Sequence, residues 1–163
     1  MGTIAEVIMD IDVEKRFVHA LRSRLPWEAC GVVVGTIYGE TVEASGFRLI
    51  RNASAHPAAQ FSFHPGDWIE AFFEAQKNQR EIVGLFHSHP TGTVVPSASD
   101  LAGSLPWKTY WIVGLGEESH EIGVFARRPA EERWTSLPLR IVSAGSNKRT
   151  GLPASSPAGP QSV

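Results

Sequence analysis

Three features that would place the chain in a particular class of protein are scarce or missing. There is one cysteine in 163 residues, Cys30, so no disulfide can form within the chain and nothing indicates an oxidising compartment. The longest apolar run, residues 29–39, is too short to cross a bilayer. Glu6 and Asp10 interrupt the N-terminal apolar stretch, which also lacks the basic start of a signal peptide. We therefore expect a cytoplasmic protein with no membrane partner.

A large excess of either charge is also missing. Fifteen Lys and Arg against seventeen Asp and Glu leave a net charge of −2, which argues against a nucleic-acid partner. The length suggests one domain, which can bury a core without disulfides. Residues 143–163 are rich in Ser, Gly, Pro and Ala and contain one large apolar residue, Leu152. We predict a folded domain over residues 1–142 and a disordered tail over 143–163.

Two segments have the periodicity of amphipathic helices. Residues 12–25 place apolar side chains four residues apart and stop before Pro26, which predicts a helix over this range. Residues 65–79 predict a second helix with Asp67 as its N-cap. The apolar face of the second helix is expected to consist of Trp68, Ile69, Phe72 and Phe73.

The remaining apolar segments are typical of strands. Strands are expected at residues 3–11, 29–39, 41–52, 59–65, 81–89, 108–116, 120–128 and 134–142. The second and third form a hairpin across Gly39 and Glu40, and a short helix begins near Ser97 or Ser99. This mixture of strands and helices predicts an α/β fold, a curved mixed sheet flanked by helices.

The stretch GLFHSHPTGTVVPSASD, residues 84–100, carries the clearest chemical signal. His87 and His89 point to the same side of a strand, and Asp100 follows a loop long enough to return a carboxylate to them. Two histidines and one carboxylate are typical of a catalytic zinc site. The alternative is that both histidines are ordinary strand-end residues. The full spacing from His87 through Ser97 to Asp100 would arise by chance in roughly one such chain in several thousand.

A zinc hydrolase also needs a carboxyl group that moves protons. Glu28 stands out because it directly precedes a buried strand, although a solvated loop acid is the alternative reading of the local sequence. Cys30 lies two residues further, on the same face of a strand. Its apolar neighbours indicate a buried structural thiol near Glu28 rather than a nucleophile.

Together these residues resemble the JAMM branch of the MPN-domain metalloproteases, in its short bacterial single-domain form. The resemblance covers roughly residues 3–127, including the stretches EACGVVVG and FSFHP. The motif residues are, in order, Glu28, His87, Ser88, His89, Pro90, Ser97 and Asp100. The fold that this resemblance implies is a curved mixed sheet with helices, similar to that of the zinc cytidine deaminases.

The resemblance also implies a role for most of these residues. His87, His89 and Asp100 are expected to bind one Zn²⁺ per chain, and Glu28 to act as the general acid and base. Ser97 is expected to donate to the oxyanion of the tetrahedral intermediate, and it can cap a helix as well. The resemblance assigns no chemistry to Ser88, whose side chain should point away from the histidines and pack or hydrogen-bond there.

The implied activity is that of a zinc-dependent metallopeptidase or isopeptidase. Members of the family cut after the C-terminal Gly-Gly of ubiquitin-like proteins, and similar short bacterial members process sulfur-carrier proteins. Residues 51–65 either form part of the substrate groove, through a strand edge that pairs with an extended tail, or are a plain surface loop. His56 and His64 in this segment are not expected to be ligands. The chain has no long insertion of the kind that gives chain-linkage specificity.

Several other functions fit the sequence less well. A metal-free MPN scaffold that only binds proteins is the main alternative, and the complete motif argues against it. A cytidine deaminase needs a pair of cysteines that this chain lacks. The HEIGV segment at His120 has Val124 where a zinc-binding helix would have its second histidine. A DNA-repair branch with the same motif carries a helix-hairpin-helix partner that is absent here.

Overall fold

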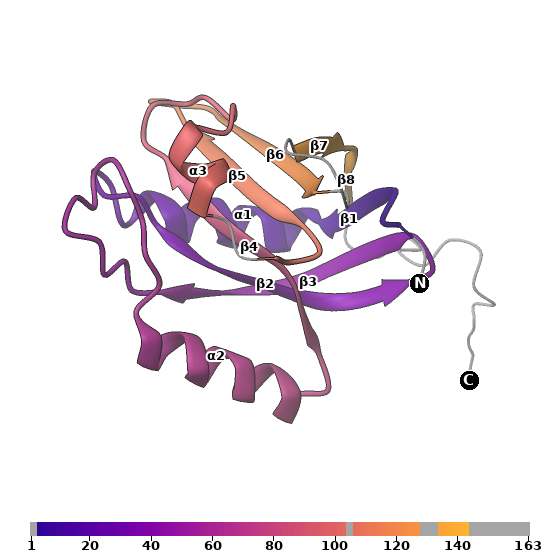
Figure 1. Ribbon diagram of the computed structural model, residues 1–163. Helices are drawn as coiled ribbons and strands as arrows, with labels where there is room; N and C mark the ends of the chain where they lie inside the picture. The colour runs from indigo at the N-terminus through magenta and orange to yellow at the C-terminus, as the bar shows by residue number, and fades with distance from the viewer. Residues whose placement is uncertain (1–2, 104–105, 128–133, 144–163) are drawn as a thin grey trace.

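The computed structural model describes residues 3–103, 106–127 and 134–143, which form one mixed sheet with helices on both faces (Figure 1). The elements are β1 Glu6–Asp10, α1 Ile11–Arg22, β2 Cys30–Tyr38, β3 Thr41–Ile50, α2 Pro65–Lys77, β4 Glu81–His89, α3 Ala98–Gly103, β5 Tyr110–Leu115, β6 His120–Arg127, β7 Trp134–Leu137 and β8 Leu139–Val142. The predicted α/β fold with a mixed sheet is confirmed. The predicted disordered tail lies, after Ser143, outside the described residues.

The sheet has eight strands in the order β7-β6-β5-β4-β2-β3-β1-β8. The pairs β1–β3, β1–β8 and β4–β5 are parallel and the others are antiparallel. β7 and β8 lie at opposite ends of this order, yet only Pro138 separates them in the chain, so the sheet curves until β8 contacts β6. The prediction of a single strand over residues 134–142 is therefore wrong. Pro138 has no N–H for a sheet ladder, and the chain changes edges there.

One face of the sheet packs against α1. The buried residues Val13, Phe17 and Leu21 lie along this helix, and the ring of Phe17 meets Phe86 edge-on at a centroid distance of 4.9 Å. The helix ends at Arg22, earlier than the predicted boundary before Pro26. A residue that precedes proline is disfavoured in a helix, and here the chain leaves the helix a few residues before that position.

The other face of the sheet packs against α2, whose cap and apolar face both differ from the prediction. His64 is the N-cap, because its Nδ1 accepts a hydrogen bond from the Asp67 amide at 3.2 Å. Asp67 lies within the first turn and forms an ion pair with Arg51. The face that meets the sheet contains Ala71 and Ala75. These small side chains let the helix lie close to the sheet.

The large apolar residues of α2 do not form one buried face. Ile69 and Phe73 are 54% and 62% exposed, whereas Trp68 is half-buried and stacks on Phe63 at 5.6 Å. The helical period of 3.6 residues places Trp68, Ala71 and Ala75 on the inner side and rotates Ile69 and Phe73 outwards. Among the described residues, none of the helices combines the length and apolar character needed to cross a bilayer.

Candidate metal centre

The end of β4 places two histidines beside one carboxylate. His87 and His89 are alternate residues of this strand, which lies between β2 and β5 in the middle of the sheet. They therefore share the face opposite to the α1 core. Asp100 lies in the first turn of α3, which follows the loop after β4. The structure thus brings together the three residues that the sequence predicts as metal ligands.

The donor atoms of these residues converge on one point. The Nε2 atoms of His87 and His89 are 3.1 Å apart, and they lie 3.1 and 3.2 Å from the two carboxylate oxygens of Asp100. Zinc bonds of 2.0–2.2 Å at tetrahedral angles place ligand atoms about 3.3–3.5 Å apart. Only a small outward movement of the three side chains would therefore accommodate the ion, and the donor set fits zinc. A fourth position would stay free for water or substrate.

Neighbouring groups orient both imidazole rings. The Nδ1 of His89 lies 3.0 Å from the carbonyl oxygen of Thr93, so it can donate there and leave Nε2 free to bind a metal. The ring of His87 stacks on Phe61 at a centroid distance of 4.5 Å and an angle of 20°. Burial lowers the pKa of His87, which favours the neutral ring that a metal needs. Sequence reasoning missed Thr93, because a carbonyl contact leaves no residue signal.

Asp100 and Ser97 hold each other at the start of α3. The Asp100 carboxylate accepts a hydrogen bond from the Ser97 amide at 2.8 Å, and the Ser97 hydroxyl accepts one from the Asp100 amide at 3.0 Å. Burial alone would raise the pKa of Asp100, but hydrogen bonds with His87 and His89 outweigh it and hold the pKa well below its usual range. Ser97 is exposed and lies next to Ser99, with 3.1 Å between the two hydroxyl oxygens. The Ser97 hydroxyl acts as an acceptor from the Asp100 amide, so the cap does not use the hydroxyl proton.

Glu28 is buried immediately before β2, at the same end of the sheet. Burial raises the pKa of its carboxyl to about 7, while the nearby charges of His89 and Asp100 act in opposite directions and partly cancel. Glu28 is thus close enough to the ligand cluster to interact with it. A carboxyl group with a pKa near neutrality can both accept and release a proton at physiological pH.

Asn52 fixes the backbone around Glu28, and sequence reasoning missed it. Its Nδ2 donates to the Glu28 carbonyl at 2.9 Å and to the Gln60 carbonyl at 3.0 Å. Its Oδ1 accepts from the amides of Ser54 and Ser62 at 3.0 and 3.1 Å. The predicted strand over residues 59–65 is accordingly wrong. Residues 59–65 form only an isolated bridge, between Phe63 and Asn52, because the Ser62 amide and the Gln60 carbonyl bond to the Asn52 side chain rather than to a neighbouring strand.

Ser88 and Cys30 are buried and make structural contacts, and neither belongs to the candidate metal cluster. The Ser88 hydroxyl is buried and accepts a hydrogen bond from the Ala29 amide at 2.8 Å, as its predicted position on the face away from the histidines requires. The Cys30 thiol is fully buried, lies 3.4 Å from the Ile50 carbonyl oxygen, and has a pKa raised to about 12 by burial. The prediction of a buried structural thiol is confirmed. Ser88 ties β4 to the residue next to Glu28.

Replacing Ser88 by alanine is expected to destabilise the protein by about 1–3 kcal/mol, because the buried Ala29 amide would lose its acceptor. Urea unfolding of the variant beside the wild type measures this loss. Ser45→Ala is the matched control, since the Ser45 hydroxyl makes one long contact of 3.4 Å and should change stability by less than about 0.5 kcal/mol. Equal stability of Ser88→Ala and the wild type would rule out this structural role.

The raised pKa of Glu28 predicts a pH dependence of the metal-free protein. Between pH 4.5 and about 7 the unfolded chain loses the Glu28 proton while the folded chain keeps it, so stability falls as the pH rises through this window. The loss is on the order of 3 kcal/mol. Glu28→Gln removes this contribution. Urea unfolding of both proteins at the two ends of the window should show a steeper decline for the wild type, and parallel curves would refute the assignment.

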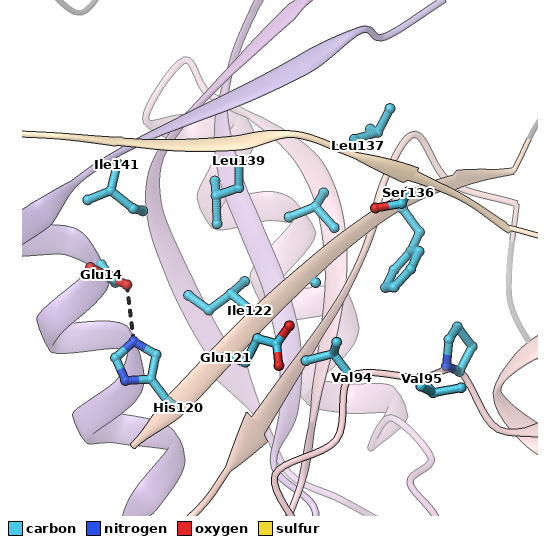
Figure 2. Close-up of a pocket in the computed structure, with 14 residues that line it drawn as sticks. Glu14, Val94, Val95, His120, Glu121, Ile122, Ser136, Leu137, Leu139 and Ile141 are labelled. Carbon is cyan, nitrogen blue, oxygen red and sulfur yellow. Dashed lines mark hydrogen bonds and ion pairs between the residues drawn. The ribbon is translucent and has the colours of Figure 1, made fainter. Parts of the chain in front are cut away.

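Two cavities lie near the loop that joins β4 to α3. One, of about 330 Å³, adjoins His87 and Asp100 and is lined mainly by aromatic side chains. The other, of about 560 Å³, contains none of the three clustered ligands (Figure 2). Figure 2 shows it between Val94 and Val95 at one end and the pair of Glu14 and His120, 3.1 Å apart, at the other. Only the first cavity opens on the cluster.

Comparison with known proteins agrees with this geometry. The family model described as prokaryotic homologs of the JAB domain matches residues 10–129. Two curated relatives, both named desampylase, are 33% identical over 81 residues, from Pyrococcus furiosus, and 32% identical over 75 residues, from Haloferax volcanii. These alignments span 50% and 46% of this chain and 57% and 52% of the relatives. The chain thus matches only about half the length of either relative.

Solved structures share the fold. A protein from Desulfitobacterium hafniense aligns with a TM-score of 0.75 at 23% identity, over 84% of this chain and 93% of its own. A protein from Salinibacter ruber aligns with a TM-score of 0.63 at 20% identity, over 86% and 94% of the two chains. The family match includes all the predicted site residues, from Glu28 to Asp100. The chain therefore belongs to the family of prokaryotic homologues of the JAB domain.

Proposed function

We propose that this protein is a zinc-dependent peptidase or isopeptidase that acts on a ubiquitin-like or sulfur-carrier protein. One observation carries the proposal. Two imidazole nitrogens and two carboxylate oxygens meet with separations of 3.1–3.2 Å, next to a buried carboxyl group whose pKa is about 7. A metal site with three protein ligands and a neighbouring general base is the arrangement found in zinc hydrolases.

Each residue of the site is assigned a separate role in the reaction. His87, His89 and Asp100 would hold one zinc ion, which supplies Lewis acidity and an activated water when bound. Glu28 accepts a proton from the attacking water and delivers it to the leaving nitrogen. Ser97 donates its hydroxyl proton to the oxyanion of the tetrahedral intermediate, since its backbone contacts with Asp100 already fix its position.

We infer the substrate class from the family resemblance. The JAMM proteins that this chain resembles cut after a C-terminal Gly-Gly, and both curated relatives are named for an enzymatic activity, desampylase. We expect the bond to follow the Gly-Gly of a small ubiquitin-like protein, joined either to a C-terminal extension or to another protein. We expect this reaction to take place in the cytoplasm.

The direct test uses the full chain loaded with zinc and a small ubiquitin-like protein that ends in Gly-Gly followed by a short extension. Mass spectrometry should show a product that ends at the second glycine, and the same substrate with Ala-Ala in place of Gly-Gly should be cut far more slowly. Zinc-loaded protein that leaves extended and isopeptide-linked substrates intact would contradict the proposal. That result would support the alternative, a protein-binding scaffold.

A further inference from the structure

The cavity of about 330 Å³ beside the metal ligands is built mainly from rings. Tyr110 and Trp134 stack in parallel at a centroid distance of 4.5 Å and an angle of 10° and form one wall. Phe61 and Phe63, from the loop before α2, form another wall at 5.8 Å from each other. His87 lies at one end, in contact with the Phe61 ring. The cavity is therefore continuous with the proposed catalytic site.

The position of the cavity follows from the strand register. Leu85 of β4 is paired with Tyr110 of β5, and Leu85 shares its face with His87. β6 and β7 extend the same face outwards, where Phe125 and Trp134 lie near each other at 5.7 Å. The sheet itself thus holds the wall of Tyr110 and Trp134 in place, and the loop held by Asn52 supplies Phe61.

The chemistry of the lining selects an uncharged occupant. The carboxylate and imidazole groups that line the cavity belong to Asp100 and His87, and the metal centre uses both. A charged side chain that entered would lose water and find no counter-ion that the metal centre does not already use, which is costly. At about 330 Å³ the space lies at the small end of ligand cavities, so it suits one large side chain rather than a folded segment.

We propose that this cavity binds an apolar or aromatic side chain on the residue that follows the scissile bond. The inference rests on the proposed function. The two residues before the bond are glycines and have no side chain to fill a cavity that opens at His87 and Asp100. The residue before Gly-Gly lies about 7 Å further along an extended chain, so the leaving residue offers the nearest side chain. The preferred substrate is then a linear extension that begins with a residue such as Phe or Leu.

The first test is a series of peptides that share an acyl part ending in Gly-Gly and continue with Phe, Leu, Ala, Ser or Lys. The wild-type, zinc-loaded chain should cleave the Phe and Leu peptides with a kcat/KM about tenfold or more above that of the Ala peptide. An isopeptide through the side chain of Lys should be cut more slowly than the Phe peptide. Cleavage at equal rates would overturn the cavity assignment and leave the proposed function standing.

Two variants locate the preference in the cavity. The Trp134 indole N–H has no acceptor within the described part of the chain, so Trp134→Leu removes ring surface without removing a hydrogen bond. Ser62→Phe fills the cavity from its exposed edge, so it tests the idea even if the first variant folds poorly. Both should lower the ratio of Phe to Ala cleavage to near one. Phe73→Ala, an exposed ring on α2 away from the cavity, is the control and should keep the wild-type ratio.

A second readout does not need catalysis. Calorimetry with the dipeptide amides Phe-Ala and Ser-Ala measures binding of the leaving group itself. We expect Phe-Ala to bind at least about tenfold more tightly than Ser-Ala, and Ser62→Phe to abolish the difference. Selective binding without any cleavage would refute the proposed function and support the cavity. Equal or absent binding of both dipeptides would overturn the cavity assignment.

Discussion

Glu28→Gln is expected to lower kcat by about 10²–10⁴-fold while the zinc content stays at the wild-type level. Glutamine has nearly the same shape as glutamate, but it cannot accept and return a proton. Glu28 is buried close to the cluster, and the pKa of its carboxyl is about 7. It can therefore both accept and release a proton at neutral pH. Glu28 is absent from the ligand cluster, which is why the metal should remain.

Single-turnover cleavage of the Gly-Gly substrate, with elemental analysis of the same samples, measures both effects. Glu117→Gln is the matched control, because this glutamate is exposed in the turn between β5 and β6 and should leave kcat unchanged. Full activity of Glu28→Gln would show that another group moves the proton. Loss of zinc from Glu28→Gln would instead make Glu28 a ligand.

Removing the metal should abolish cleavage completely, and adding zinc back should restore it. Adding zinc to the metal-free protein should also raise its melting temperature. A ligand present at a thousand times its Kd stabilises the folded state by about 4 kcal/mol. His89→Ala should respond to neither step. Its Nε2 contacts both other members of the cluster, so its loss leaves two ligands that cannot hold the ion firmly.

His120→Ala is the control for this experiment. His120 pairs with Glu14 of α1 at 3.1 Å and does not belong to the cluster, so its loss should leave zinc binding unchanged. A His89→Ala protein that still shows the wild-type thermal shift with zinc would mean that the ion binds elsewhere. Cleavage that survives a strong chelator would mean that the reaction needs no metal.

The cluster of candidate metal ligands could be predicted from the sequence because its geometry is mostly local. His87 and His89 share a face through the two-residue period of a strand, and Ser97 and Asp100 are joined by a reciprocal cap over four residues. The position of Glu28 depends on contacts between distant segments. The motif resemblance suggested it, whereas local sequence alone favoured a solvated loop acid.

Features that depend on tertiary contacts escaped prediction. The buried face of α2 was predicted wrongly from its large apolar residues. Ala71 and Ala75 pack closely against the sheet, whereas Phe73 is exposed. A loop held by Asn52 stands where a strand was expected, since its amide side chain bonds to Glu28, Ser54 and Gln60. The two edges of the sheet meet at Pro138 only because the whole sheet curves. No short stretch of sequence contains that information.

Metal content by elemental analysis tests whether His87, His89 and Asp100 form a zinc site. The measurement compares purified wild-type protein with Asp100→Ala. The substitution removes the carboxylate that contacts both histidines. We predict one zinc per wild-type chain and almost none in the variant. No zinc in the wild type, even after incubation with the metal, or equal zinc in both proteins, would mean that these three residues do not form a zinc site.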